Sequence, residues 1–396
     1  MNFFTRLIHN NKLIIGLWCA VSLVVFIKHN FLSSRHDNYY VYKNAYLHAS
    51  ENKILYGDYK DGLDKNNYGP FFSLFFAPFA LMPDALGEFL YVSLGILLLL
   101  YGIYFLPLME WQRNVMLLIC LNELLTSGFN VQFNIYVAAV IPLTYILIVR
   151  GKEIWAPLPF LVGAFVKLYG IVALAFFFFV KDKPKFILGC FLWTIVLFLA
   201  PMIITSPEYV VNMYVEWFNT LIIKNSENIS VKTTYQDISI MGFFRRMLSE
   251  PTIPSLPFLI GGVILFGLPY IRISQYKNKA FQLLLLASTM IFPVIFSSSS
   301  EGSTYIIAFV GIALWFVIQP QPYRWYIWAL LGGVIFFASL NSTDIYPIAV
   351  RHWFRLHAFK ALPCTLVWLR IIYEMMIKDF SGYKTNEEPE KKLVAS

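Results

Sequence analysis

The sequence has few charged residues for its length. Only 14% of its 396 residues are Asp, Glu, Lys or Arg, whereas 58% are hydrophobic and 18% are aromatic. So much apolar surface cannot be hidden in a single water-soluble core. The composition therefore excludes an ordinary soluble domain and predicts an all-α membrane protein that crosses the bilayer many times.

The four cysteines form no motif. They are spread singly through apolar runs, without a CxxC or Cys/His spacing, at Cys19, Cys120, Cys190 and Cys364. A disulfide framework or a structural metal site needs such spacing, so we expect neither. The net charge of +8 lies between the apolar runs. Anionic membrane lipids and the positive-inside rule explain this charge more simply than nucleic acid does.

Apolar runs recur along the whole chain. A helix that crosses a bilayer needs about 20 residues. The first run resembles the apolar part of a signal peptide, but no small-residue cleavage site follows it cleanly, so we expect an uncleaved first span. The runs lie near residues 13–28, 69–82, 86–108, 114–127, 131–149, 154–180, 184–205, 256–273, 280–297, 304–318, 325–340 and 358–377.

Two runs of unusual length decide the topology. Run 69–82 is short for a span, whereas run 154–180 is long and has Lys167 near its middle. If the first lies on or dips into the outer surface and the second breaks at Lys167 and crosses twice, twelve crossings result with both termini inside. The alternative, in which run 69–82 crosses and run 154–180 is one span, also gives twelve crossings. It turns Arg150 and Lys152 outward, against the positive-inside rule, so we favour the first arrangement.

This topology makes residues 1–378 a single transmembrane domain. Its outer loops are 29–85, 206–254 and 341–357, and the polar tail 379–396 is predicted to be cytoplasmic and disordered. We expect a multi-pass protein of the plasma (inner) membrane whose reacting groups face outward. No repeat of fixed period is visible, which weakens the interpretation as an inverted-repeat transporter.

Asp37 raises the first question of chemistry, because it lies just beyond the first apolar run. It precedes a helical stripe typical of a helix in the membrane interface, with aromatic rings at head-group depth. Asp is also a preferred N-cap residue, because its carboxylate accepts hydrogen bonds from the first turn of a helix. On its own the cap interpretation is the stronger, and the alternative is a reacting carboxylate at the mouth of a cavity. The stripe consists of Tyr39, Tyr42, Ala45, Tyr46 and Ala49.

Several segments in a fixed order resemble a known family. They are Asp37 with Tyr42 and Ala45, Leu55-Tyr56-Gly57, Tyr68-Gly69-Pro70-Phe71 running into Ala77 to Pro83, Asn130-Val131-Gln132-Phe133-Asn134, Ala164 to Tyr169, and Asp237 to Arg246. In order and spacing they resemble glycosyltransferase family 87, the polyprenyl-phosphate-mannose-dependent mannosyltransferases of the GT-C superfamily. The resemblance implies a GT-C-like fold with about 12 transmembrane helices and juxtamembrane helices on the outer face.

Three positions depart from the pattern of this family. Asn130-Val131 stands where a glycine is expected, and Gly170 replaces the proline that usually follows the lysine. The segment Ser299 to Tyr305 lacks the His and Trp that we associate with that place. The third departure bears on the specificity for sugar or acceptor more than on the fold.

The resemblance implies transfer of a hexose, by family resemblance mannose, from a polyprenyl-phosphate-sugar to a lipid-linked or cell-surface glycan acceptor. Such a donor carries its own leaving group, so an inverting displacement needs one base for the acceptor hydroxyl. Paired carboxylates are not required, and no nucleotide-binding glycine loop or DxD metal pair is visible around Asp37. The resemblance implies that Asp37 is the base, with no metal and no cofactor.

The leaving phosphate gains negative charge, so fixed cations near it should stabilise the transition state. Lys167 is the best candidate, with snorkelling toward head groups as the alternative. Arg245 and Arg246 would either clamp the phosphate or contact lipid. Arg351 and His352 have the same two interpretations, and for them the lipid contact is the stronger.

Polar side chains near the predicted turns are candidates for binding the sugar or the acceptor. They are Gln132 and Asn134, for which capping and turn chemistry is the alternative, and Glu301, for which simple solvation is the stronger interpretation. Tyr68, which lies in one of the matching segments, is the fourth candidate.

Two other functions remain open at this point. A transporter or flippase of lipid-linked sugars would account for Lys167 inside an apolar run, but not for Asp37 in a long first outer loop. An O-antigen polymerase or ligase would depend on basic residues of a late outer loop more than on an acid after the first span.

Overall fold

The computed structural model describes residues 8–32, 37–59, 63–229 and 234–380, and every regular element in this part of the chain is a helix. The predicted all-α class is confirmed. The predicted tail lies outside the described residues from residue 381 onward. The α-helices are α2 (Asn11–Ile27), α3 (Asp37–Ser50), α4 (Phe71–Ala80), α5 (Asp84–Tyr104), α6 (Glu110–Phe129), α7 (Asn134–Val149), α8 (Pro157–Val166), α9 (Lys183–Leu199), α10 (Pro207–Ile229), α11 (Ile240–Met247), α12 (Leu256–Gly267), α13 (Lys279–Ile295), α14 (Tyr305–Val317), α15 (Trp325–Val334), α16 (Ile348–Leu356) and α17 (Ala361–Ile377).

Short π- and 3-10 segments extend or join these helices. They are the π-helices η1 (Lys28–Leu32) and η7 (Ile335–Ser339) and the 3-10 helices η2 (Leu168–Phe179), η3 (Ala200–Ile203), η4 (Leu268–Ile271), η5 (Ile273–Gln275), η6 (Gly302–Thr304) and η8 (Leu340–Ser342). Every predicted apolar run therefore coincides with helical structure.

Four helical stretches in the described residues are long and apolar enough to cross a membrane. They are Asn11–Leu32, Asp84–Tyr104, Lys183–Ile203 and Trp325–Ser342, and several shorter apolar helices accompany them. These stretches expose much of their apolar surface, whereas α7, α13 and α14 are buried over almost their whole length. Apolar side chains that face outward around a buried apolar centre indicate an integral membrane protein.

The break predicted inside run 154–180 is confirmed. Helix α8 ends at Val166, Lys167 is extended with φ −145° and ψ 118°, and η2 begins at Leu168. The two helices then pack against each other. Gly170 makes this possible, because a Cβ there would lie 2.5 Å from the carbonyl oxygen of Phe160. This close approach explains why glycine stands where the resemblance suggests proline.

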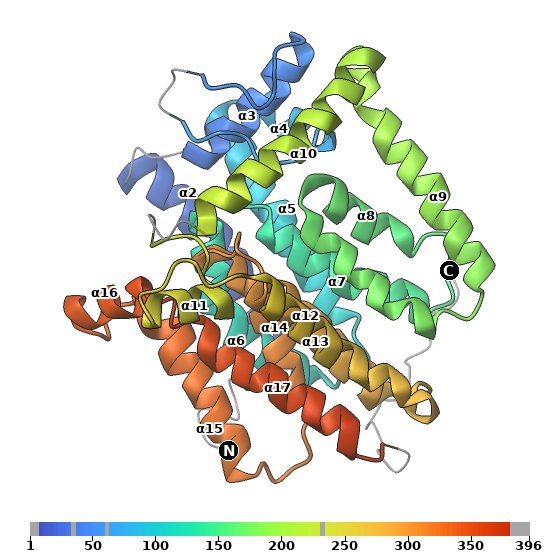
Figure 1. Ribbon diagram of the computed structural model, residues 1–396, viewed down its shortest axis with the longest axis vertical. Helices are drawn as coiled ribbons and strands as arrows, with labels where there is room; N and C mark the ends of the chain where they lie inside the picture. Colours follow the sequence, from blue (N-terminus) through green and yellow to red (C-terminus); the bar gives the residue numbers. More distant parts are fainter. Residues whose placement is uncertain (1–7, 33–36, 60–62, 230–233, 381–396) are drawn as a thin grey trace.

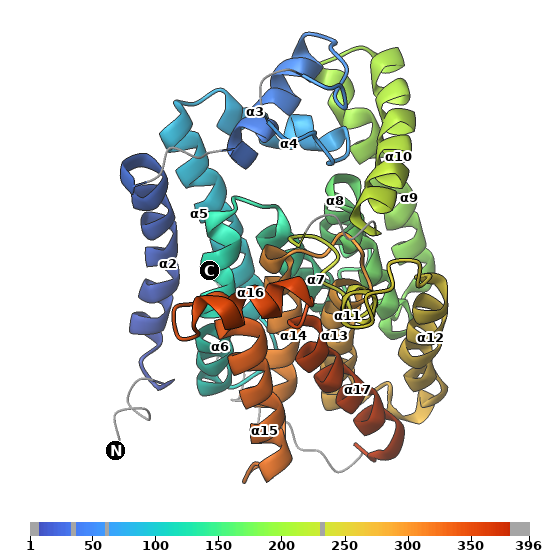
Figure 2. The same ribbon diagram turned by 60° about the vertical axis from the view of Figure 1, so that its left-hand side comes forward.

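Helices α3 and α4 lie across one end of the long helices, and α16 lies across the end of α15 (Figure 2). The rings of Tyr39 and Tyr42 on α3 are buried inside the protein, with 0% and 1% of their surface exposed. They pack edge to face on Phe76 of α4. The stripe therefore fastens α3 onto α4, since aromatic pairs in this geometry add to the stability gained by burial.

Helix α10 is tied to the segment that follows α3, although the two are far apart in sequence (Figure 1). The indole of Trp217 donates to the carbonyl oxygen of Asn67 at 3.0 Å. The hydroxyl of Tyr209 donates to the carbonyl oxygen of Lys53. These bonds join the two segments above the ends of the buried helices.

Candidate active site

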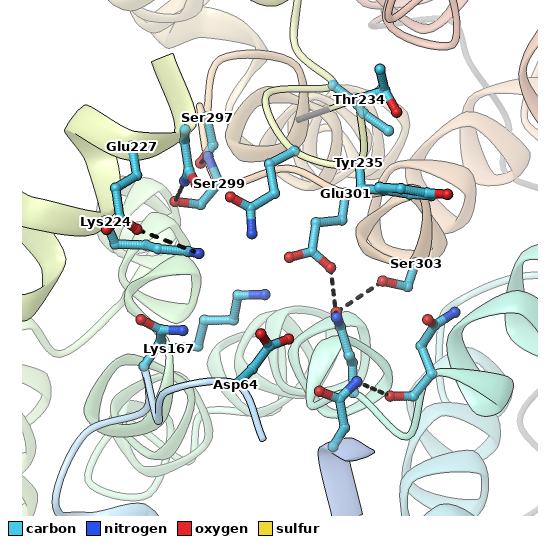
Figure 3. A pocket seen from close by; sticks show the side chains of 18 of the residues that line it. Asp64, Lys167, Lys224, Glu227, Thr234, Tyr235, Ser297, Ser299, Glu301 and Ser303 are labelled. Carbon is cyan, nitrogen blue, oxygen red and sulfur yellow. Dashed lines mark hydrogen bonds and ion pairs between the residues drawn. The ribbon is translucent and has the colours of Figure 1, made fainter. Parts of the chain in front are cut away.

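A cavity of about 1180 Å³ opens beneath α3 and α10. Its walls come from α3, Tyr56 and residues 64–68, the turn after α6, the break at Lys167, α10, residues 234–238 before α11, the loop before η6, and α16. Figure 3 shows polar side chains from these separate segments pointing into one space. A mainly helical scaffold thus surrounds a polar interior, which is unusual for the apolar core of a membrane protein.

Lys167 points into this cavity from the break between α8 and η2 (Figure 3). Its Nζ donates to the Oδ1 atom of Asn134 at 2.8 Å and lies 5.0 Å from the centre of the Tyr169 ring. Within the described part of the chain, Lys167 forms no ion pair. The lysine therefore presents a positive charge to the cavity without a carboxylate bonded directly to it.

The turn after α6 has a strained backbone. Val131 has φ 50°, in the left-handed region that β-branched residues rarely adopt. This is the place where the resemblance suggests glycine, and Val131 adopts this backbone conformation at an energetic cost. Asp237 and Ala358, at φ 51° and 48°, lie at or beside the cavity wall as well. Such strain is concentrated at functional sites.

Gln132 and Glu301 meet across the cavity wall. The Nε2 atom of Gln132 donates to Glu301 Oε2 at 2.6 Å, and its Oε1 atom accepts from Ser303 Oγ at 2.8 Å. Asn134, which is fully buried, donates to the same Oε1 atom at 2.5 Å. The structure thus brings three of the predicted sugar-binding residues together, with Asn134 behind Gln132 rather than on the wall.

Tyr68 lines the cavity near Lys167. Its hydroxyl lies 2.9 Å from the hydroxyl of Tyr42. Burial raises the pKa of the Tyr68 phenol well above its ordinary value, so the hydroxyl keeps its proton. The next residue, Gly69, donates to the carbonyl oxygen of Val166 at 3.1 Å. A Cβ at Gly69 would lie 2.0 Å from the carbonyl oxygen of Phe165, so only glycine allows this contact.

Asp37 is the first residue of α3, as the cap interpretation predicts to within one residue. Its side chain lies outside the described part of the structure. The next residue, Asn38, lines the cavity and donates to the carbonyl oxygen of Asn130 at 2.7 Å. The backbone of Asp37 therefore begins a helix at the edge of the cavity, beside the turn that carries Gln132.

Arg351 and His352 lie on α16 and also line the cavity. Arg351 donates to Asp344 Oδ1 at 2.7 Å, but that carboxylate is almost fully exposed, so water screens this ion pair. The ring of His352 lies 3.3 Å from a guanidinium nitrogen of Arg355. Both predicted residues are therefore accessible from the cavity.

Arg245 and Arg246 are placed differently, because neither belongs to the cavity wall. Arg245 donates to Asp237 Oδ2 at 2.8 Å in an ion pair whose side chains are 0% and 1% exposed. It also donates to the carbonyl oxygen of Ile253 at 2.9 Å. Arg246 is 7% exposed and donates to the carbonyl oxygen of Gln236. These arginines hold the loop before α11 in place, and their guanidinium groups do not face the cavity.

Sequence reasoning missed a buried ion pair at the cavity. The Nζ atom of Lys360 lies 2.7 Å from Glu123 Oε2, with side chains 7% and 0% exposed, and Lys360 lines the cavity. Glu123 stands inside an apolar run, which is a signal for function, but its pairing with a residue 237 positions away was not visible. Among the described residues, no three His, Cys, Asp or Glu side chains are grouped so that they could hold a metal ion.

This arrangement defines a helical membrane protein with a cavity into which both cations and carboxylates point. The family model of glycosyltransferase family 87 matches residues 66–298, which is more than half of the chain. The chain therefore belongs to this family, and it is a glycosyltransferase by membership. No curated protein matches the chain. The matched segment contains Lys167, whereas Asp37 and Glu301 lie outside it.

Proposed function

We propose that the protein transfers a hexose, by family resemblance mannose, from a polyprenyl-phosphate-sugar to a lipid-linked or cell-surface glycan acceptor. The observation that carries the proposal is the position of Lys167, a cation without a carboxylate partner that points into the cavity of a family 87 protein. A phosphate is the group that such a cation would bind most strongly in a cavity shielded from water.

The proposed architecture is GT-C-like, with residues 1–378 as one transmembrane domain of about 12 crossings. In this proposal the run that is broken at Lys167 passes through the membrane twice, as the two short helices α8 and η2. Helix α4 lies across the bundle end, which supports an outer helix that does not cross (Figure 2). Both termini would then be cytoplasmic, and the cavity would face outward from the plasma (inner) membrane.

The proposed reaction is a single displacement with inversion. The carboxylate of Asp37 takes the proton of an acceptor hydroxyl, and that oxygen forms a bond to the anomeric carbon of the sugar. The bond from this carbon to the phosphate oxygen breaks, and its electron pair leaves with the polyprenyl phosphate. Lys167 stabilises the charge that develops on this phosphate. Arg351 and His352 are further phosphate ligands in this proposal, and Arg245 and Arg246 support the fold instead.

The sugar and acceptor would occupy the region between Lys167 and the turn after α6. Tyr68, Gln132 and Glu301 line this region, and their hydroxyl, amide and carboxylate groups are those that bind sugar hydroxyls. Asn134 supports Gln132 from behind. The membrane lipids around the protein would receive the polyprenyl tail, and no cofactor is needed because the donor carries its leaving group.

The test is transfer of radiolabelled mannose from a short-chain polyprenyl-phosphate-mannose to extracted membrane glycolipids. Purified wild-type protein and its Asp37→Asn variant are compared side by side. We expect transfer by the wild type and a loss of at least about 100-fold in the variant, because the amide cannot accept the proton. Equal transfer by both proteins would remove Asp37 from the mechanism. A wild type that binds the donor but forms no product would support a transporter or flippase instead.

A further inference from the structure

Four side chains form a continuous hydrogen-bond chain along the cavity wall. Lys167 donates to Asn134 at 2.8 Å, Asn134 donates to Gln132 at 2.5 Å, and Gln132 donates to Glu301 at 2.6 Å. The four residues come from three segments that are distant in sequence. Figure 3 shows the two ends of this chain, Lys167 and Glu301, both pointing into the cavity.

The chemistry of these groups fixes the direction of the hydrogen-bond chain. A lysine ammonium only donates, so Asn134 must turn its oxygen toward Lys167 and its NH2 group toward Gln132. Gln132 must then receive that bond with its oxygen, which also accepts from Ser303. Its NH2 group is left to face Glu301, whose ionised carboxylate only accepts. Amide orientation is often ambiguous, but here the lysine determines it.

The direction of the hydrogen-bond chain decides which donor and acceptor groups remain to bind a ligand. Asn134 is fully buried, with both ends of its amide engaged. The oxygen of Gln132 already accepts two hydrogen bonds. Glu301 is half-buried, lines the cavity and gives only one of its oxygens to Gln132. A carboxylate has about four acceptor positions, so Glu301 is the acceptor that the wall presents to the cavity.

Lys360 also holds the turn that carries Glu301. Lys360 donates to the carbonyl oxygen of Gly302 at 3.3 Å while it is paired with Glu123. Gly302 directly follows Glu301, so the turn that carries Glu301 is held from both sides. An acceptor held in this way selects hydroxyl groups by position, because it cannot move to follow a misplaced one.

We infer that Glu301 accepts a hydrogen bond from one hydroxyl of the donor's sugar while Lys167 binds the phosphate of the same donor. Asn134 is a positioning residue that links the two and does not touch the ligand. The spacing of the two ends would thus select hexosyl phosphates that carry a hydroxyl at one particular ring position. This inference rests on the proposed function for the identity of the donor, but it concerns binding and not transfer.

The test measures binding of a short-chain polyprenyl-phosphate-mannose and its four monodeoxy analogues to purified protein, without acceptor. We expect the wild type to bind one analogue about 10- to 100-fold more weakly than the parent donor, because one hydrogen bond to a charged group is lost. Glu301→Gln should abolish this discrimination, since the new amide must turn its oxygen to Gln132 and its NH2 group to the cavity. The matched control, Glu227→Gln on the opposite wall, should keep it.

A variant that reverses part of the hydrogen-bond chain provides the sharper test. Asn134→Asp pairs directly with Lys167 and should weaken the binding of all analogues alike, so the measured quantity is the ratio of affinities between analogues. The new carboxylate also cannot donate to Gln132, so Gln132 must turn around and present its oxygen to Glu301, which lowers this ratio. The double variant Asn134→Asp, Glu301→Gln restores it in part, because Gln132 then accepts from the new glutamine and that glutamine turns its oxygen to the cavity. The hydroxyl of Ser303 can rotate to accept from the reversed Gln132.

Each outcome decides one of the two proposals. Loss of discrimination in both single variants, with recovery in the double variant, supports the proposed role of the hydrogen-bond chain. A wild type that fails to discriminate between analogues, or fails to bind the donor, overturns the inference, as does a Glu301→Gln variant that discriminates like the wild type. Discrimination in binding together with an absence of any transfer would leave the inference standing and remove the proposed transferase function.

Discussion

Lys167 and Arg245 are both cations that the sequence suggested as ligands for the donor phosphate, but the fold places Lys167 half-buried at the cavity and Arg245 fully buried. Arg245 is paired with the buried carboxylate of Asp237, whereas the hydrogen-bond partner of Lys167 is the neutral amide of Asn134. A paired charge has little attraction left for a ligand, and a charge held by an amide keeps it. The partner of such a cation, more than the cation itself, therefore indicates whether it serves stability or binding.

Removing Arg245 should have the largest effect of all the changes that test this comparison. Arg245→Met leaves the carboxylate of Asp237 buried without its partner, which should lower the free energy of unfolding by about 3–5 kcal/mol. The measurement is thermal or denaturant unfolding in detergent. Transfer per folded molecule should change far less than stability, because Arg245 does not line the cavity. A folded variant that no longer binds donor would contradict the comparison.

Removing Lys167 should have a slightly smaller effect, and on a different quantity. Lys167→Met should lower kcat/KM for transfer by about 10²- to 10³-fold, because one fixed group that stabilises the leaving phosphate is lost. Stability should fall little, since no carboxylate is left unpaired. Lys167→Arg serves as the matched control and should recover part of the rate, because it keeps the charge but not the shape. Comparable transfer rates for the Lys167→Met and Lys167→Arg variants would show that the charge at this position is irrelevant to transfer.

Crowding the break at Lys167 should have a moderate effect. Gly170→Ala places a Cβ against the carbonyl oxygen of Phe160, which should cost about 1–3 kcal/mol of stability as α8 and η2 are pushed apart. Since Lys167 lies between these helices, donor binding should weaken too. Gly332→Ala is the control, because a Cβ there would meet no atom within 4 Å. Equal stability of the two variants would show that the break does not depend on this close contact.

Relieving the strain at Val131 should have the smallest effect. Val131→Gly relieves the left-handed backbone, but it also removes a side chain that is 3% exposed and frees the unfolded chain, so the opposing effects should cancel to within about 1 kcal/mol. Unfolding of the two proteins under the same conditions measures this difference. The transfer rate should stay close to that of the wild type, because the turn keeps its conformation. A variant that is less stable than the wild type would mean that the side-chain packing of Val131 outweighs its strain.

Local patterns in the sequence predicted the helices and the break at Lys167, because these depend on neighbouring residues. The start of α3 at Asp37 was predicted in the same way. The burial of Tyr39 and Tyr42 was not, because an aromatic stripe looks the same against lipid and against another helix. The pairings of Arg245 with Asp237 and of Lys360 with Glu123 could not be predicted, since one depends on a tight loop and the other on contact across the whole fold.

The departures from the family pattern were visible in the sequence, but their meaning was not. Gly170 allows two helices to touch, and Val131 adopts the backbone conformation for which glycine is suited. The meaning of both substitutions depends on backbone geometry that one-dimensional patterns do not contain. For the candidate site, six of the ten predicted residues line the cavity, namely Tyr68, Gln132, Lys167, Glu301, Arg351 and His352. The order in which the side chains bond to one another came from the structure.

The bonds from Trp217 to Asn67 and from Tyr209 to Lys53 have a consequence for motion. They join α10 to the segment after α3 at two places, so neither can swing outward alone without breaking hydrogen bonds. Any widening of the cavity on this side must therefore move both segments together or break these hydrogen bonds. Such a concerted movement of two joined segments is slower than the fluctuation of a single loop.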